Sequence, residues 1–546
     1  MSTSTSSSLT FRALLKKAAG RLGIGSPVRR VTGLTPAAQA MYASACAARG
    51  RTLLVVPTDA DVERMVADAR FFLSALEGLT DSDAAREVLP FPSHEVDPYR
   101  GLAPHFDIAS ARARALHALA SPSRSVRLIV ASAAALLPRI SAPERLTSVS
   151  LTLVPGQEIP PLDLGDLLSA AGYTRQDPVD QSGEFCVRGG VVDFFPAGAR
   201  QPLRLEFMGD TIESIREYDA ATQRSTASLD QTSIEPLQEL IGVAEEDQDR
   251  PATLFDYLRA GPRPLILVSE PDDVKVHGEK LTAQLHASYE DAIRKGMQVP
   301  PPSGILVDWP QVTEWLQGAT ELDTLDIASP AADAQSVHVS CQPAIEFGGR
   351  IQDWVADVRR AREAGDTVIF VANSAGMGER TVELLGDYDV LAVPIERAED
   401  VQRTPVLVCT GYLSKGFRLP EAGLQLWAET DVFEEERKAH DRRQSTSRAF
   451  LSDFRDLKVG DLVVHVDHGI GVFVGLKRIE VGADPQEFME LRYAADDKLF
   501  VPVERLDLVQ RFTGPPVPAS TGLAGRRGKR PRRVSRRPCA TWPRSC

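Results

Sequence analysis

The chain has 546 residues, enough for several domains that each bury a core of their own. An apolar content of 43% and a charged content of 25% are typical of a globular protein and exclude a disordered or fibrous chain. The net charge of −13 argues against a protein that coats DNA regardless of sequence, because such binding relies on Lys and Arg. The six cysteines are scattered without a C-x-x-C spacing, which predicts a reducing, cytoplasmic location.

Residues 1–145 predict the first part of an open α/β domain. Residues 51–57 (RTLLVVP) and 126–131 (VRLIVA) each follow a helical pattern and are largely apolar. Continuous apolar runs of this length are typical of parallel strands that are buried on both faces. The same texture returns in residues 233–339, where 264–269 (PLILVS) predicts another strand. We therefore expect one α/β domain that is built from two separated parts.

Residues 146–232 differ from both flanking parts. The stretch 184–195 (EFCVRGGVVDFF) alternates in the manner of a strand, and residues 204–219 continue a sheet with polar turns. Such alternation is typical of an antiparallel sheet with one buried face. We predict a small α+β domain that is inserted into the α/β domain.

The last third of the chain predicts two further domains. Residues 340–432 repeat the α/β pattern, and the charged segment 433–457 predicts a helical linker. From 458 to 514, four short strands follow one another with polar turns between them. Closely spaced antiparallel strands favour a small β-barrel. The predicted fold class is therefore a multidomain α/β protein with a small barrel behind it.

No catalytic, metal-binding or cofactor-binding residue is assigned from the sequence. A phosphate loop needs G-x-x-x-x-G-K-[ST], whose amides and lysine hold the phosphates. Residues 31–38 (VTGLTPAA) stand where such a loop would, but they lack a lysine and contain Pro36. His465 and His468 have a spacing that suits a metal, but no third ligand lies near them in sequence. Ser414 in GYLSKGF lacks the spacing of a nucleophile elbow.

Several long strings resemble the bacterial transcription-repair coupling factor. They match its UvrB-like module, the domain next to that module, and its RNA-polymerase-interacting domain. The resemblance implies that this last domain is a small Tudor/SH3-like β-barrel, which is also found in CarD-type regulators. UvrB has V-T-G-S-G-K-T where this chain has VTGLTP, so the resemblance implies a UvrB-like fold without the ATPase. The similar strings are residues 91–108 (FPSHEVDPYRGLAPHFDI), 183–196, 204–223, 415–431, 459–472 and 490–508.

The resemblance also implies partners. Members of the family release RNA polymerase stalled at a DNA lesion and recruit the repair protein UvrA, and the full-length family binds double-stranded DNA. For this chain it implies that the inserted domain binds UvrA and that the CarD-like barrel binds the polymerase β subunit. Arg188 matches the basic UvrA-binding strand shared with UvrB, and Arg175 and Arg204 are nearby matches. UvrB has a further arginine where this chain has Cys186, and an ordinary surface arginine is the alternative for Arg188.

Strand geometry adds an expectation about the polymerase contact. A sheet of four short strands cannot close all its edges, and an open edge offers amides and carbonyls to a partner strand. We expect contacts at Leu476, Ile479, Phe488 and Leu491. For Ile479 and Leu491, packing inside the barrel is the alternative.

Residues 515–546 form a basic tail of a different character. They carry eight Arg and one Lys without an acidic residue. Shifting plausible GC-rich codons for residues 536–546 (RRPCATWPRSC) by one nucleotide produces the helix-like sequence KKAMRDMAEELL, which resembles the segment C-terminal to the barrel in the family. We therefore expect an out-of-frame tail on the front part of a longer protein. A natural basic tail is the alternative.

Three functions are compatible with these features. The first is an adaptor that holds the UvrA- and polymerase-binding modules but lacks the family's ATP- and Mg-dependent translocase motor, and so uses no cofactor. The second is a helicase-like ATPase with an unrecognised site, and the third is a stand-alone CarD-like transcription regulator. The missing phosphate-loop lysine favours the adaptor, and the long UvrB-like region disfavours the regulator.

Overall fold

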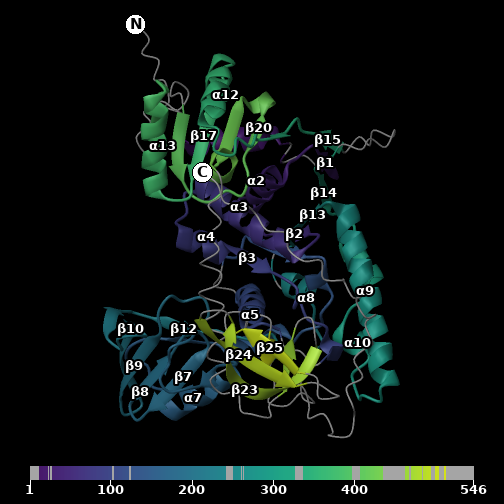
Figure 1. The fold of residues 1–546 in the computed structure, drawn as a ribbon, viewed down its shortest axis with the longest axis vertical. Helices are drawn as coiled ribbons and strands as arrows, with labels where there is room; N and C mark the ends of the chain where they lie inside the picture. Colours follow the sequence, from purple (N-terminus) through teal and green to yellow (C-terminus); the bar gives the residue numbers. More distant parts are fainter. Residues whose placement is uncertain are drawn as a thin grey trace, which may run out of the picture. The chain divides into compact units, whose positions relative to one another are not determined.

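A computed structural model describes residues 11–22, 24, 28–100, 104–121, 125–240, 250–259, 261, 263–325, 336–395, 406–433, 462–465, 469–481, 484–492, 498–502 and 509–511. The chain divides into two compact units, 1–437 and 438–546 (Figure 1). No helix among the described residues is long and apolar enough to cross a membrane.

The first domain is built on a seven-stranded parallel sheet with the order β15-β1-β14-β13-β2-β4-β3. Every residue of β2 and β4 is buried, which confirms the prediction of strands covered on both faces. The strands are β1 (Arg30–Thr32), β2 (Thr52–Val56), β3 (Val88–Phe91), β4 (Leu128–Ser132), β13 (Leu265–Ser269), β14 (Thr320–Asp323) and β15 (Ser336–His338).

Two hydrophobic clusters cover the two faces of this sheet. Along β2, Leu54 and Val56 enter one cluster, whereas Leu53 and Val55 enter the other, as the alternation of a strand requires. The helices of the domain are α1 (Phe11–Arg21), α2 (Pro36–Ala47), α3 (Asp59–Glu77), α4 (Asp81–Glu87), α5 (Phe106–Ala120), α6 (Pro143–Ser148), α8 (Leu254–Arg259), α9 (Pro271–Arg294), α10 (Pro302–Ile305) and α11 (Trp309–Trp315).

The predicted insertion is present between β4 and β13. It is entered and left through an antiparallel ribbon of β5 (Leu151–Leu153) and β12 (Thr232–Ile234). Its main sheet has the order β11-β10-β9-β8-β7-β6, and α7 (Pro161–Ala170) packs against β7 and β8. The strands are β6 (Thr174–Arg175), β7 (Glu184–Arg188), β8 (Val191–Phe194), β9 (Leu203–Met208), β10 (Thr211–Tyr218) and β11 (Ser225–Ser228).

A buried ion group joins the exit of the insertion to the first domain. Arg112 on α5 is fully buried, and its Nε donates to Glu239 Oε2 at 2.7 Å. His94 Nε2 lies 2.7 Å from Glu239 Oε1, and Arg112 Nη1 donates to the Pro92 carbonyl at 2.6 Å. Burial raises the pKa of the Glu239 carboxyl, but the contacts with Arg112 and His94 outweigh it and lower the pKa to about 2. The motif at 91–108 therefore contributes to a structural junction.

The third domain has a six-stranded sheet with the order β16-β20-β21-β17-β19-β18. Val368 and Phe370 of β17 face the core shared with α12 and α13, whereas Ile369 and Val371 enter the core shared with the first domain. The elements are β16 (Gln342–Pro343), α12 (Ile351–Glu363), β17 (Thr367–Ala372), α13 (Ala375–Asp387), β18 (Ala392–Pro394), β19 (Val406–Thr410), β20 (Phe417–Leu419), β21 (Leu424–Ala428) and α14 (Glu429–Val432) (Figure 1).

A second polar contact ties the third domain to the first. Asp68 on α3 is almost completely buried, and it accepts from Ser414 N at 2.7 Å and from Ser414 Oγ at 2.6 Å. Burial is the main cause that raises the pKa of Asp68 to about 6. Ser414 is thus a bonded partner of a buried carboxylate at a domain junction.

The second unit contains a five-stranded antiparallel sheet with the order β25-β24-β23-β22-β26. It has one more strand than the sequence predicted, because the three-residue β26 carries too little pattern to be recognised. The predicted linker at 433–457 lies almost wholly outside the described residues. The strands are β22 (Leu462–His465), β23 (Gly469–Val481), β24 (Asp484–Arg492), β25 (Lys498–Pro502) and β26 (Val509–Arg511).

Candidate partner-binding surfaces

One face of the inserted sheet carries a buried carboxylate that two arginines hold. The register places Cys186, Asp193 and Arg204 in one cross-strand row, and Arg188 lies at the end of β7. Arg188 Nη2 donates to Asp193 Oδ2 at 2.7 Å, and Arg204 donates from Nε and Nη2 to the two carboxylate oxygens at 2.8 Å each. Asp193 is fully buried. A buried carboxylate is tolerated when it is paired, and these two guanidinium groups supply the pairing.

Further contacts hold both arginines from the outside. Arg188 Nη1 lies 3.2 Å from Asp177 Oδ1. The Arg204 guanidinium stacks over the Tyr218 ring at 4.6 Å from its centroid, and the Tyr218 hydroxyl donates to the Val179 carbonyl at 3.1 Å. The hydrogen bond to the buried carboxylate is the main cause that raises the pKa of each arginine. Both side chains therefore stay charged.

The three arginines singled out from the sequence have different surroundings. The Arg188 side chain is 44% exposed and the Arg204 side chain 20%, so both remain open to solvent although they are paired. Arg175 is exposed on β6, where it pairs in register with Phe185, whose ring lies in the domain core. The structure therefore brings Arg188 and Arg204 together and does not include Arg175 in their cluster.

Sequence reasoning missed Asp193 and Tyr218. A signal for Asp193 was present, because a carboxylate within the apolar run VVDFF needs a cation when that strand is buried. No local pattern identified its partners. Arg204 lies on the next strand, and Tyr218 lies beyond a second turn.

Another part of the chain lies against residues 31–38, which stand where a phosphate loop would but lack its lysine. Gly33 has a φ of +82°, and a Cβ there would lie 2.3 Å from the Val339 carbonyl oxygen. Thr32 Oγ1 lies 3.0 Å from His338 Nδ1. Pro36 begins α2 directly after this loop. A phosphate cradle needs free amides and space above a glycine, and segment 336–341 lies against this glycine instead.

Polar groups beside this loop are bonded to one another. Gln39 Nε2 donates to Glu270 Oε1 at 3.1 Å, and Ser269 Oγ donates to Gln39 Oε1 at 2.6 Å. Thr324 donates to the same glutamate oxygen from its backbone N at 2.9 Å and from its hydroxyl at 2.5 Å. Carboxyl ends of parallel strands often bind ligands, but these groups already satisfy one another.

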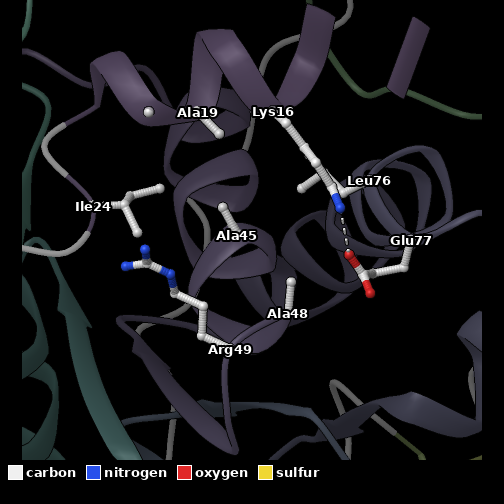
Figure 2. A pocket seen from close by; sticks show the side chains of 9 residues that line it. Lys16, Ala19, Ile24, Ala45, Ala48, Arg49, Leu76 and Glu77 are labelled. Carbon is white, nitrogen blue, oxygen red and sulfur yellow. Dashed lines mark ion pairs between the residues drawn. The ribbon is translucent and has the colours of Figure 1, made fainter. Parts of the chain in front are cut away.

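A cavity of about 290 Å³ opens among α1, α2 and α3. Figure 2 shows Lys16 reaching Glu77, an ion pair of 3.3 Å, with Arg49 on the other side. The remaining lining is formed mainly by alanines with Leu76 and Ile24. The charged side chains of this lining are the Lys16–Glu77 ion pair and the exposed Arg49, and they do not form a pair of groups suited to general acid–base catalysis. Among the described residues, no three His, Cys, Asp or Glu side chains gather to hold a metal.

The second unit places the four residues expected to contact the polymerase on two strands. Leu476 and Ile479 lie on β23 and pair with β24, beyond the residues of β23 that pair with β22. Phe488 and Leu491 lie on β24, which is paired on both sides by β23 and β25. The edge position was therefore wrong for Phe488 and Leu491. Leu491 is also fully buried, so it packs in the core of the sheet. Partner contacts at these positions stay predictions.

Three family matches fall on three of the regions described above. Residues 151–240 match the UvrB interaction domain, residues 362–432 match the MFD D3 domain, and residues 457–513 match the CarD-like/TRCF RID domain. The fold and these matches define a multidomain α/β protein with an inserted UvrB interaction domain and a CarD-like domain.

Curated relatives agree with these matches. The chain is 26% identical to the transcription-repair-coupling factor of Myxococcus xanthus over 86% of its own length and 44% of the relative. It is 25% identical to the transcription-repair-coupling factor of Bacillus subtilis (strain 168) over 71% of its own length and 38% of the relative. It is 24% identical to that of Staphylococcus aureus (strain bovine RF122 / ET3-1) over 88% of its own length and 45% of the relative. The matches confirm that this chain resembles the N-terminal portion of the transcription-repair coupling factors. It spans less than half the length of these relatives.

Proposed function

We propose that this chain acts as a two-ended adaptor in transcription-coupled repair. Its inserted domain binds UvrA, and its CarD-like domain binds the β subunit of RNA polymerase, in the cytoplasm. Double-stranded DNA binding belongs to the longer family members. The observation that carries the proposal is the pair of held, charged arginines, Arg188 and Arg204, within the segment that matches the UvrB interaction domain. Such a pair suits carboxylates on a partner.

Binding to purified UvrA tests the first half of the proposal. Arg188→Ala and Arg204→Ala should each weaken binding about tenfold or more, because each removes a charge-assisted contact. Arg200→Ala is the matched control, since Arg200 is an exposed arginine of the same domain. Wild-type chain that does not bind UvrA, or arginine variants that bind as wild type does, would count against this assignment.

The polymerase contact is proposed for the free stretch of β23. Residues of β23 beyond Phe473 have no partner strand on the side of β22 among the described residues, so their backbone groups suit strand pairing. Ile479→Arg should weaken binding to the polymerase β subunit while thermal unfolding stays unchanged. Val472→Arg is the control on the same strand, because β23 is paired on both sides there. Equal effects of both variants would contradict the edge assignment.

We also infer that the loop at 32–36 holds no nucleotide. The residues present do not fit a phosphate, because the lysine is missing and the Val339 carbonyl lies against Gly33. Purified chain should therefore release phosphate from ATP far more slowly than ordinary motors, which turn over about once per second or faster. DNA-stimulated turnover at such a rate would favour a helicase-like ATPase instead.

A further inference from the structure

Asp193 is placed where it cannot touch a partner. It has no exposed surface, and it lies in the interior of the sheet on β8, between β7 and β9. Its two oxygens accept three hydrogen bonds from Arg188 and Arg204. Any contribution of Asp193 to recognition must therefore act through these two arginines.

The contacts divide each guanidinium into an inner and an outer part. Arg204 uses Nε and Nη2 towards the buried carboxylate. Arg188 uses Nη2 in the same way, and its Nη1 lies 3.2 Å from the exposed carboxylate of Asp177. A guanidinium has five N–H donors, so each arginine retains donors for a second carboxylate. Within the described part of the chain, no hydrogen bond occupies Arg204 Nη1. The arginines are thus anchored and still able to bind.

The surroundings of Arg204 restrict it from a second direction. The Tyr218 ring lies under its guanidinium, and Gln223 Oε1 accepts from Nη2 at 3.3 Å. Tyr218 is itself fully buried and bonded to the Val179 carbonyl. A long side chain held from three sides has few rotamers left to lose.

We propose that Asp193 is a positioning residue that presents Arg188 and Arg204 as one preorganised pair to carboxylates of UvrA. The inference rests on the proposed function of the inserted domain. Without Asp193, each arginine would have to become ordered when the partner binds. Ordering such side chains weakens association, whereas ordering them in advance strengthens it.

If Asp193 had only a structural role, its substitution would weaken binding to the same extent with and without the two arginines. A double-mutant cycle separates this role from the positioning role. Asp193→Asn keeps the volume and removes the charge. With both arginines present it should weaken binding to UvrA about tenfold, equivalent to about 1.4 kcal/mol. In the Arg188→Ala, Arg204→Ala background it should have no further effect, because the groups that it positions are absent. Asp166→Asn, an exposed carboxylate on α7, is the matched control.

The free chain provides a readout that does not depend on UvrA. In wild type the Arg204 Nε–H should exchange slowly with water in NMR spectra, and Asp193→Asn should accelerate that exchange about tenfold. Equal exchange in both proteins would overturn the positioning role. The positioning role would also be overturned if Asp193→Asn weakened binding to UvrA equally with and without the two arginines. It would be overturned as well if Asp193→Asn left the affinity for UvrA unchanged. Failure of the wild-type chain to bind UvrA would overturn the proposed function and, with it, the partner assigned to this pair.

Discussion

Polar residues are used in opposite ways at two places: at the carboxyl ends of the strands of the seven-stranded sheet, and on the face of the inserted sheet that carries Arg188 and Arg204. At the carboxyl ends of the strands of the first sheet, four polar residues form hydrogen bonds with one another, and Gly33 packs against Val339. The four residues are Gln39, Ser269, Glu270 and Thr324. On the inserted sheet, one buried carboxylate holds two arginines, and each arginine keeps further N–H donors. The position that resembles a binding site by topology is therefore closed, and the mainly antiparallel inserted sheet carries the candidate surface.

The difference has a physical cause. Polar groups stabilise a fold when they satisfy one another out of water, but such groups have no hydrogen bonds left for a ligand. A half-exposed arginine anchored by a buried carboxylate adds less to stability and keeps its capacity to bind. The comparison predicts that substitutions at inward-facing groups change stability, whereas substitutions at Arg188 change binding.

The largest effect is expected at the buried ion group of Arg112. Arg112→Met would leave Glu239 as a buried carboxylate with only His94 beside it. Breaking a buried ion pair from one side costs about 3–5 kcal/mol of unfolding free energy. Urea denaturation measures the loss. Arg86→Ala, which removes an exposed pair with Asp83, is the control and should cost less than about 1 kcal/mol.

The same group predicts a loss of stability in acid. The pKa of Glu239 is about 2 in the folded chain and ordinary in the unfolded one, so its contribution is complete above pH 4.5. It is lost as the pH falls from 4.5 towards 2. Denaturation at pH 7 and pH 3 should show a decrease of about 2 kcal/mol from this carboxyl. Glu239→Gln lacks this carboxyl, so an equal change in stability from pH 7 to pH 3 in wild type and in this variant would contradict the assignment.

Asp68 should show the opposite pH dependence. Its pKa of about 6 lies above the ordinary value of 3.8, so its protonated form favours the folded chain. That contribution is present below pH 4 and is lost as the pH rises through 6. Asp68→Asn should therefore be more stable than wild type at pH 7 by about 2–3 kcal/mol. The asparagine can still accept from Ser414 N and donate to Ser414 Oγ.

The measurement for Asp68 is the difference in unfolding free energy between pH 4.5 and pH 7. The Asn variant should lose the decrease that wild type shows over this range. Asp166→Asn serves again as the exposed control and should leave the pH profile unchanged. An Asn variant less stable than wild type at pH 7 would mean that the hydrogen bonds outweigh the cost of burying the charge.

The closed loop predicts a smaller effect at Gly33. Gly33→Ala places a Cβ against a backbone oxygen and holds alanine at a positive φ, so it should destabilise the chain by about 1–3 kcal/mol. Gly50→Ala, where nothing lies within 4 Å, is the matched control. Thermal unfolding of both variants makes the comparison. Equal transitions would mean that the loop is open and would revive a nucleotide site there.

The smallest effect on stability is expected at Arg188. Its side chain is half-exposed, and Arg204 still holds Asp193 when Arg188 is removed. Arg188→Ala should change the unfolding free energy by less than about 1 kcal/mol while it weakens binding to UvrA. Thermal unfolding and binding on the same preparations separate the two effects. A cooperative loss of folding would place Arg188 with the inward-facing groups.

Local pattern in the sequence was sufficient for the elements and for much of their grouping. Apolar runs identified β2, β4 and β13, and alternation identified the inserted sheet, because burial on one or two faces leaves a periodic trace in a strand. The missing lysine at 31–38 was also visible without a structure. Such features depend on residues that are neighbours in the chain.

The tertiary structure alone decided which distant residues meet. Asp68 and Ser414 are 346 positions apart, and the closure of the loop at Gly33 depends on Val339, far along the chain. The one-sided pairing of β23 beyond Phe473 and the burial of Leu491 depend on which strands pair on either side. The sequence of a single strand does not identify its neighbouring strands. Sequence therefore determined where the strands and the arginines stand, whereas long-range pairing determined which polar groups face inward and which stay exposed.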